Sequence, residues 1–307
     1  MQQILTTHLP FNFESTVRSH GWYQLAPIQW DEATKVLRKP EALSRGKVVL
    51  LEISEHRDGL TVSVDEPLSA EEEAELTQKL RWMFWLDSDF SEFYAAADQE
   101  PRLVHCRIKS YGRLLRSTTL FEDVVRVMMT TNIQWSGTKR LVAKLVENFG
   151  APLPQSIILR AFPTPQAVAN SDEVTLRSLG LGYRSPYLLK LAQGIVSGQI
   201  QLESFRDEEK PTEQLRKEIL KLPGIGPYAA ATVLSILGRF DYIGVDSEAV
   251  SSVSKYFYEG KPVGEKEVYA IFGKWGKYKA LAYWFWDFSG MQLSPIEQYE
   301  NKTEGQR

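Results

Sequence analysis

The stretch of this sequence best equipped for chemistry is LPGIGPYAAATVLSILGRFDYIGVDSEAV, residues 222–250. Gly224 and Gly226 permit a tight turn with positive φ angles and leave no side chain over it. Pro227 suits the first position of the next helix, where its missing N–H costs nothing. Free N–H groups at such a helix start can bind phosphate. One helix later follows a single carboxylate, Asp246, placed to cap a further helix. From the glycines alone, an ordinary hairpin between two helices is as good an interpretation as a phosphate-binding hairpin.

The elements before residue 118 predict a small α+β region. KVVLLEIS (residues 47–54) and LTVSVDE (residues 60–66) are rich in β-formers, and the Asp58-Gly59 pair between them indicates a hairpin. SAEEEAELTQKLRWMFWLD (residues 69–87) begins with a serine and several acids, and predicts a capped amphipathic helix. LVHCRIK (residues 103–109) follows and predicts a further strand.

From Thr119 onward, proline and glycine separate a series of predicted helices. These segments are LFEDVVRVMMTTN, WSGTKRLVAKLVENFG, TPQAVANS, SDEVTLRSLG, SPYLLKLAQGIVSG, PTEQLRKEILKL, GPYAAATVLSILG and EKEVYAIFGKWGKYKALAYWFWDF. The fold class we expect is mostly α, with an N-terminal α+β domain at residues 1–118. A helical domain is expected at residues 119–300, followed by a frayed tail at 301–307.

Composition narrows the classes of protein. A hydrophobic content of 43% and a charged content of 24% are those of an ordinary globular protein. No apolar run reaches the ~18 residues of a membrane span, and the N-terminal residues do not resemble a secretory signal, so we expect an intracellular protein. The lone Cys106 excludes a disulfide within the chain and a four-cysteine iron–sulfur cluster. The net charge of −3 argues against a wholly basic surface, but not against a local basic face.

The LPGIG hairpin, followed about twenty residues later by Val245-Asp246, resembles the HhH-GPD superfamily of DNA base-excision glycosylases. Residues 120–150 resemble its first core helix pair, residues 162–169 its usual connector, and residues 179–195 the next helix junction. LRWMFWLDSDFSEFYAA and GRLLRSTTLFE resemble the alkylation-repair (3-methyladenine DNA glycosylase II) and 8-oxoguanine glycosylase branches. The resemblance spans roughly residues 80 to 290, in the right order.

The resemblance implies a helix-hairpin-helix glycosylase fold and assigns Asp246 as the catalytic aspartate. Cleavage of a glycosidic bond builds positive charge on the deoxyribose, and a fixed carboxylate stabilises that charge and orients water. Capping of the following helix is the alternative role, and both can hold. Bifunctional relatives carry a nucleophilic lysine where this chain has Tyr228, so a monofunctional enzyme without lyase activity is implied. Lys221 and Lys190 are the alternative nucleophiles.

A base pocket and an intercalating turn are also implied. Tyr228 and Trp286 correspond to aromatic pocket positions, where ring faces attract a cationic alkylated base, and Glu248 also belongs to this pocket. Core packing is the alternative role of Trp286. TNIQW corresponds to the intercalating turn of the superfamily. The candidates for filling the vacated stack and contacting the opposite base are Asn132, Ile133 and Gln134. A plain turn between two helices is the alternative.

Phosphate contacts are expected from the N–H groups of the hairpin together with one lysine. The residues concerned are Gly224, Gly226, Tyr228 and Lys221. Lys139, Arg140 and Arg184 are further candidates, with solvated helix faces as their alternative. In relatives, carbonyls of this hairpin hold a structural monovalent or alkaline-earth cation, and the corresponding positions are Leu220, Leu222 and Ile225. No cofactor and no iron–sulfur cluster is expected to serve catalysis.

Three functions therefore compete. The first is a monofunctional glycosylase that flips an alkylated purine such as 3-methyladenine and hydrolyses its N-glycosidic bond. The second is a glycosylase for an oxidised or deaminated base, which Asn132 and GRLLR favour. The third is a non-catalytic helix-hairpin-helix DNA-binding protein. The expected partner is double-stranded DNA containing a damaged base, bound by a monomer located with the DNA and not at a membrane.

Overall fold

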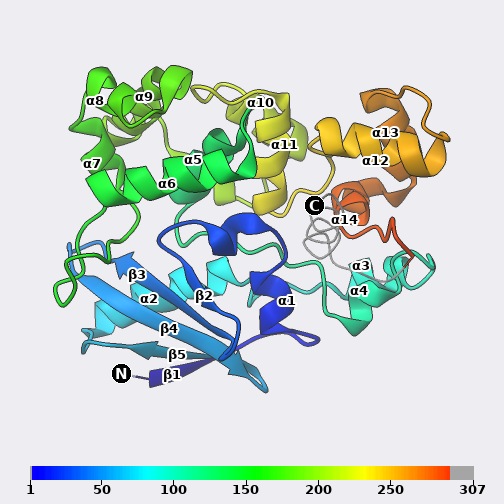
Figure 1. Cartoon of the computed structure of the whole chain (residues 1–307). Coiled ribbons are helices and arrows are strands. Elements are labelled where there is room, and N and C mark those ends of the chain that lie inside the picture. The colour runs from blue at the N-terminus through cyan, green and yellow to red at the C-terminus, as the bar shows by residue number, and fades with distance from the viewer. Residues whose placement is uncertain (1, 291–307) are drawn as a thin grey trace.

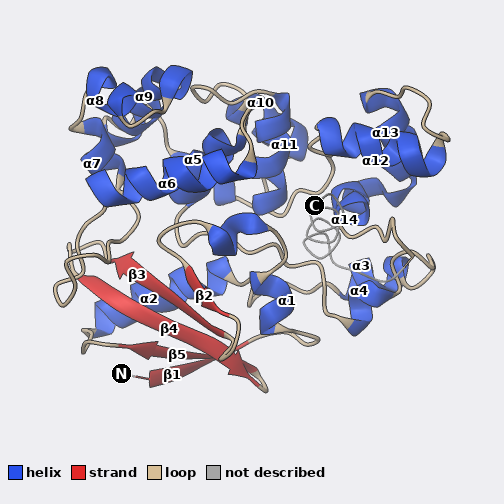
Figure 2. Cartoon of the chain, in the orientation of Figure 1, coloured by secondary structure: helices blue, strands red, loops and turns tan. Residues whose placement is uncertain are grey.

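The structure, a computed structural model, describes residues 2–290 of the chain. A small sheet occupies one side of the molecule, and helices are stacked above it (Figure 1). All strands belong to the sheet region, while the rest of the described chain is helix and loop (Figure 2). This is the expected fold class. The predicted tail at residues 301–307, and residues 291–300 of the predicted helical domain, lie outside the described residues.

The sheet has five antiparallel strands in the order β1-β5-β4-β3-β2. The two predicted strands are present as β4 (Val48–His56) and β5 (Gly59–Val64), joined at Asp58-Gly59. Three further strands were not expected, namely β1 (Gln2–Thr6), β2 (Gln29–Asp31) and β3 (Val36–Ala42). In β3 the charged Lys39 and Glu41 are buried, so the strand lacks the apolar alternation by which strands are usually identified.

The predicted capped helix is α2 (Ala70–Met83), and its Ser69 and Glu72 form a capping box. The prediction of a strand at residues 103–109 is wrong, because this segment contains the short helix α4 (His105–Ile108), which follows α3 (Ser91–Ala97). Leu103 and Cys106 are three residues apart and both fully buried. Helical spacing lets the two side chains share one core, whereas a strand would point them to opposite faces.

The helical region begins at α5, whose residues from Leu120 to Met129 are all buried. After the short N-terminal α1 (Phe13–Val17), the bounds are α5 (Leu120–Thr130), α6 (Trp135–Phe149), α7 (Pro165–Ala169), α8 (Glu173–Ser178), α9 (Ser185–Val196), α10 (Thr212–Ile219), α11 (Pro227–Ile236), α12 (Ser247–Phe257), α13 (Glu265–Phe272) and α14 (Lys279–Trp284). The C-terminal segment predicted as one helix is broken at Gly276, where φ is 54°. Helix α14 ends at Trp284, so Trp286 lies beyond it instead of on a helix.

Two of the three apolar clusters among the described residues hold most of these elements together. The larger joins the sheet and α2 to α5, α6, α9 and α11, and the smaller joins α3 and α4 to α12, α13 and α14. Arg116 links the regions, because its guanidinium lies over Trp82 and Trp85 and its Nε donates to the carbonyl of Ile236. The domain boundary at residue 118 stays a prediction, since the larger cluster includes residues from both sides of it.

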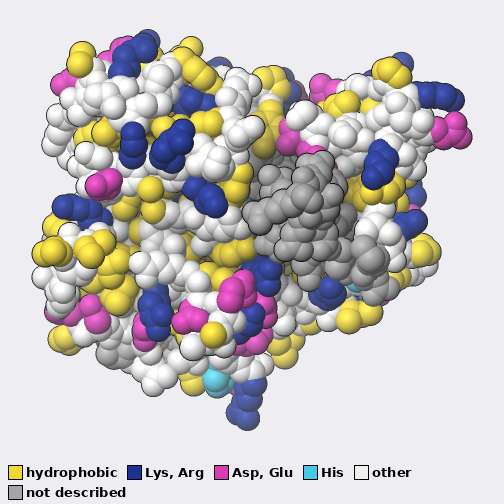
Figure 3. Space-filling model, in the orientation of Figure 1, with side chains coloured by type: hydrophobic (Ala, Val, Ile, Leu, Met, Phe, Trp, Pro, Cys, Tyr) yellow, Lys and Arg dark blue, Asp and Glu magenta, His cyan; other side chains and the backbone are white. Residues whose placement is uncertain are grey.

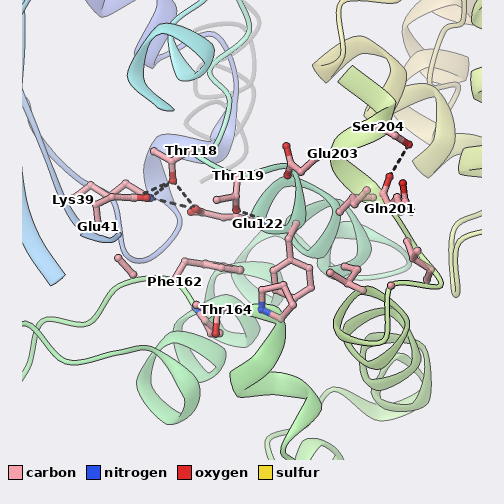
Figure 4. Close-up of a pocket in the computed structure, with 18 residues that line it drawn as sticks. Lys39, Glu41, Thr118, Thr119, Glu122, Phe162, Thr164, Gln201, Glu203 and Ser204 are labelled. Atoms are coloured by element: carbon pink, nitrogen blue, oxygen red, sulfur yellow. Dashed lines mark hydrogen bonds and ion pairs between the residues drawn. The ribbon is translucent and has the colours of Figure 1, made fainter. Parts of the chain in front are cut away.

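A cavity of about 530 Å³ lies between the sheet and the helices (Figure 4). Its apolar walls come from α5, the segment before α7 and the end of α9, and one side carries buried charges. Lys39 Nζ bonds to Glu41, and lies 3.2 Å from a carboxylate oxygen of Glu122. No residue of the 222–226 hairpin or of α12 lines this cavity. The cavity therefore lies where the sheet meets the helices, and it is separate from the predicted site at the hairpin and Asp246.

Candidate DNA-binding and catalytic site

The predicted hairpin connects α10 to α11 and is closed by backbone hydrogen bonds. The N–H of Leu222 donates to Ile219, and the N–H of Ile225 donates to Leu222. Leu222 and Ile225 are buried and attach the turn to the core. Gly224 has the expected positive φ of 75°. The expectation of a positive φ at Gly226 is wrong, because its φ is −95° in an extended cap conformation that begins α11.

The start of α11 exposes backbone donors. Gly226 caps this helix without a side-chain hydrogen bond, and Pro227 occupies the first turn as predicted. Within the described residues, the N–H groups of Gly224, Gly226 and Tyr228 donate to no backbone or side-chain acceptor. An added Cβ at Gly226 would meet no atom within 4 Å, so the approach to these donors is open. Such a cluster of N–H groups is suited to a phosphate oxygen.

Asp246 is the N-cap of α12, and its Oδ1 accepts from the N–H of Ala249 at 2.9 Å. The side chain reaches the surface at this helix start. Partial burial among protein atoms raises the pKa of Asp246 above the ordinary value, and the negative charge of Glu248 raises it further. Glu248 itself is anchored by the Oγ of Ser252, which donates to it at 3.1 Å. Two carboxylates therefore share the first turn of α12.

Tyr228 connects the hairpin to this aspartate. Its ring packs against the segment that leads to Asp246, since an added Cβ at Gly244 would lie 3.5 Å from two ring carbons of Tyr228. Burial raises the pKa of the Tyr228 hydroxyl, and the charge of Asp246 raises it further. Tyr228, which was predicted to stand in the place of a nucleophilic lysine, is thus an electrostatic neighbour of the candidate catalytic group.

Tyr283, which the sequence analysis did not single out, belongs to the same group. Burial raises the pKa of its hydroxyl well above the ordinary value, and the charges of Asp246 and Glu248 add to the effect. Tyr283 lies on α14 and meets Phe272 edge to face, with ring centroids 5.5 Å apart. The signal in the sequence was the aromatic run YWFWDF, from which Trp286 was selected instead.

Trp286 is buried in the smaller apolar cluster. Its ring contacts Phe257 and Phe272 at centroid distances of 5.8 Å and 5.4 Å. Packing of this kind is the core role that was weighed as its alternative. A role of Trp286 in the base pocket stays a prediction. Tyr283, from the same segment, is influenced by the charge of Asp246.

The predicted intercalating turn lies between α5 and α6. Asn132 is exposed at its tip with a left-handed φ of 50°, and Gln134 is exposed at the start of α6. Ile133 is only partly buried and folds back on α6, because an added Cβ at Gly137 would lie 2.6 Å from its side chain. As the turn stands in the structure, its outermost side chains are polar. The wedge roles of the three residues stay predictions.

A second aromatic residue that was not singled out accompanies this turn. Tyr183 is 48% exposed, and its hydroxyl lies 3.2 Å from Thr131 Oγ1 and 3.4 Å from Asn132 Nδ2. Arg184, a candidate phosphate contact, is buried and donates to the carbonyls of Met128 and Thr131. Arg184 therefore holds the turn in place. The signal for both residues was the Gly-Tyr-Arg sequence at the helix junction.

Lysine and arginine side chains gather over the helices around α5 and α6, whereas the sheet side mixes charges of both signs (Figure 3). Lys139, Arg140 and Lys221 are exposed and form no ion pair within the described residues. Many other lysines are paired with carboxylates, as Lys35 is with Glu14. The acidic net charge thus coexists with unneutralised cations on the helical side.

The carbonyls expected to hold a structural cation lie at the hairpin. The oxygen of Leu222 accepts from Ile225, whereas those of Leu220 and Ile225 accept no hydrogen bond from a turn or loop N–H among the described residues. Free carbonyl oxygens are suitable ligands for a hard cation.

In the described part of the chain, no three His, Cys, Asp or Glu side chains are grouped to bind a metal. No described helix is long and apolar enough to cross a membrane.

Known proteins resemble this chain in both sequence and fold. DNA-3-methyladenine glycosylase of Bacillus subtilis is 26% identical over 182 residues, which cover 57% of this chain and 58% of that protein. The matches cover between 41% and 58% of the length of three curated relatives.

Among solved structures, a 3-methyladenine DNA-glycosylase from Archaeoglobus fulgidus superposes with a TM-score of 0.73 at 22% identity, over 92% of this chain and 96% of that one. The 8-oxoguanine glycosylase/lyase of Clostridium acetobutylicum, in complex with double-stranded DNA, has a TM-score of 0.67 at 17% identity, over 92% and 93% of the two chains. At these identities the two structures establish the shared fold.

The family model that matches residues 125–277 is that of the HhH-GPD superfamily base excision DNA repair proteins. The matched range contains the turn at Asn132, the hairpin at Gly224 and the helix cap at Asp246. It ends before Tyr283, which α14 brings back to the same place. The chain belongs to the HhH-GPD superfamily of base excision DNA repair proteins.

Proposed function

We propose that this protein is a monofunctional DNA glycosylase that removes an alkylated purine from double-stranded DNA. The observation that carries the proposal is the continuity of the site. Free N–H groups of the hairpin, the ring of Tyr228 and the carboxylate of Asp246 follow one another along α11 and the segment after it. A DNA backbone held at the hairpin would then present a deoxyribose to the carboxylate.

The chemistry needs one carboxylate, one water and an extruded base. The C1′–N bond breaks, and the bonding electron pair leaves with the base. Asp246 stabilises the positive charge that develops on the sugar. A water oxygen then bonds to C1′, and its proton passes to the carboxylate, which leaves an abasic site. A cationic alkylated purine departs as a neutral base, so this reaction requires no general acid.

The aromatic residues favour an alkylated base as the substrate. The charge of Asp246 raises the pKa of both Tyr228 and Tyr283, and the charge of Glu248 also raises that of Tyr283. Aromatic faces and negative charge both attract a cationic ring, with cation–π contacts worth ~0.5–2 kcal/mol. An oxidised base is the second candidate, because the exposed amide of Asn132 at the tip of the turn can hydrogen-bond to a base edge.

The absence of a lyase step is part of the proposal. A phenol cannot form a Schiff base with the sugar, and Tyr228 occupies the place of the family's lysine. We further propose that the protein acts as a monomer located with the DNA. The carbonyls of Leu220, Leu222 and Ile225 would hold a structural cation that braces the hairpin.

The test uses duplexes that each carry one defined lesion: 3-methyladenine, 7-methylguanine, hypoxanthine or 8-oxoguanine. Strand cleavage is measured with and without alkali for the wild type and for Asp246→Asn, which retains a capping side chain. We expect release of the alkylated bases, cleavage only after alkali, and a loss of on the order of 100-fold or more in the variant.

Each arm contradicts a different part of the proposal. Release of 8-oxoguanine alone would favour the second candidate substrate. Cleavage without alkali, with borohydride trapping of the protein on DNA, would refute the monofunctional claim. Binding of DNA without release of any lesion would leave a non-catalytic DNA-binding protein.

A further inference from the structure

Tyr187 lies directly against the hairpin, although it is far from it in the sequence. It is the third residue of α9 and is 40% exposed. An added Cβ at Gly224 would lie 2.8 Å from the Cβ of Tyr187, 2.9 Å from Cγ and 3.1 Å from Cδ2. The backbone of the hairpin therefore rests on the base of this tyrosine ring. Gly224 is required here both by its positive φ and by this contact.

The hydroxyl of Tyr187 is available to a ligand. Tyr187 is an exposed residue, and within the described residues its hydroxyl takes part in no hydrogen bond. A phenolic O–H donates well to a phosphate oxygen. The neighbouring hairpin supplies N–H donors that are also without acceptors.

A cation stands on the same helix face. Lys190 follows Tyr187 by three residues on α9, and side chains at this spacing are neighbours on a helix surface. Lys190 is exposed and forms no ion pair within the described residues. Its ammonium group is therefore free to attract an anion near the tyrosine.

The start of α9 also reaches the second turn of the site. Tyr183 precedes Tyr187 by four residues, and its hydroxyl lies beside Thr131 and Asn132. One face of this segment thus contacts the intercalating turn at one end and the phosphate-binding hairpin at the other. Residues 183–187 therefore connect the two turns that are expected to engage DNA.

We propose that Tyr187 and Lys190 form a second phosphate-binding wall beside the hairpin, in which the Tyr187 hydroxyl donates to a phosphodiester oxygen of the bound strand. The ammonium group of Lys190 neutralises the charge of the same or the adjacent phosphate. This inference rests on the proposed function only in requiring that the protein binds duplex DNA through the hairpin.

The experiment measures binding separately from catalysis. The Asp246→Asn protein is titrated into a fluorescein-labelled duplex that carries a tetrahydrofuran abasic-site analogue, and Kd is determined from anisotropy at several salt concentrations. Tyr187→Phe and Lys190→Gln are each added to this background. Tyr256→Phe and Lys266→Gln serve as matched controls, because both residues are exposed on other helices.

We expect Tyr187→Phe to raise Kd about 5-fold, the equivalent of one hydrogen bond, without changing the salt dependence. Lys190→Gln should raise Kd and reduce the slope of log Kd against log salt by about one unit. The two controls should match the parent. A purely structural role of Tyr187 would not respond to loss of the hydroxyl alone.

Two results would overturn the proposal. One contradicts this inference alone, and the other contradicts the proposed function as well. If the parent binds the duplex and Tyr187→Phe has the same Kd as Tyr256→Phe, the inference about the wall is wrong and the proposed function stands. If the Asp246→Asn protein does not bind this duplex at all, both the inference and the proposed function fall.

Discussion

At the scale of single residues, the candidate site combines the Asp246 carboxylate, which the proposed reaction requires in its ionised form, with neighbours that oppose its ionisation. Burial and the charge of Glu248 both raise the pKa of Asp246. The hydrogen bond from Ala249 acts in the opposite direction, because it stabilises the charged form. In the proposed reaction, Asp246 would hold its charge close to a sugar on which positive charge develops.

The raised pKa of Asp246 predicts a pH dependence of base release. Activity requires the ionised carboxylate, so the rate should fall as pH drops through a pKa that lies above that of an ordinary aspartate. Replacement of Glu248 by Gln removes a nearby negative charge and should move this acidic limb to lower pH. Single-turnover release of 7-methylguanine at closely spaced pH values measures it.

Glu259→Gln is the control for this shift, because Glu259 is exposed beyond the end of α12. Its acidic limb should coincide with that of the wild type. An unchanged limb in Glu248→Gln would contradict the electrostatic link between the two carboxylates.

At the scale of elements, the hairpin works because two helices are joined by a turn that leaves its N–H groups free. Pro227 at the start of α11 has no N–H group that would need an acceptor, and Gly226 at the cap has no side chain that would cover the turn. The fit of Gly224 against Tyr187 attaches the turn to α9 as well. The candidate phosphate-binding element is therefore a junction of three helices.

Replacing Gly224 by Ala should destabilise this junction in two ways. A left-handed φ costs an alanine about 1–2 kcal/mol, and its Cβ would also collide with Tyr187. We expect a loss of unfolding free energy and weaker DNA binding, measured by urea denaturation and anisotropy. Gly260→Ala is the matched control, because Gly260 has φ of 81° with no atom within 4 Å of an added Cβ. Equal losses in the two variants would show that the contact with Tyr187 does not matter.

At the scale of the whole molecule, segments from both ends of the described chain meet around His20. Its ring nitrogen is hydrogen-bonded to the carbonyl of Leu115, and the ring lies 4.7 Å from that of Trp22 and 6.4 Å from that of Trp284. Trp284 Nε1 also donates to the carbonyl of Ser19. The N-terminal segment is thereby fastened to α14, which carries Tyr283 of the site.

Burial lowers the pKa of His20 to about 4, and this predicts how stability depends on pH. Above the unfolded pKa of ~6.5 the ring is neutral in both states, so its contribution is fully present. As pH falls towards 4, the unfolded chain binds a proton that the folded protein excludes, and stability decreases by at most about 3 kcal/mol.

Urea denaturation at pH values between 7.5 and 4.5 tests this decrease. His20→Gln should flatten the pH dependence, whereas His8→Gln, at an exposed histidine, should leave it unchanged. Equal pH dependence in the His20 variant and the wild type would contradict the assignment.

The sequence by itself determined those features whose causes lie within a few residues. Pro227 and the Asp246 cap set the starts of α11 and α12, Asp58-Gly59 set the β4–β5 hairpin, and the Ser69 capping box set the start of α2. Turn and capping signals act through local dihedral angles and local hydrogen bonds, which leave a recognisable pattern. The hairpin and the candidate catalytic aspartate were therefore predictable.

Only the tertiary structure decided which side chains from distant parts of the sequence lie beside the hairpin and Asp246. The charge of Asp246 raises the pKa of Tyr283 although the two lie far apart in the sequence, on helices α12 and α14 that are separated by α13 and the break at Gly276. Tyr187 contacts Gly224 because α9 packs beside the hairpin. Strand β3 was missed because its Lys39 and Glu41 are buried by pairing with each other and with Glu122. Contacts of this kind depend on partners far apart in the chain, so no local pattern of residues specifies them.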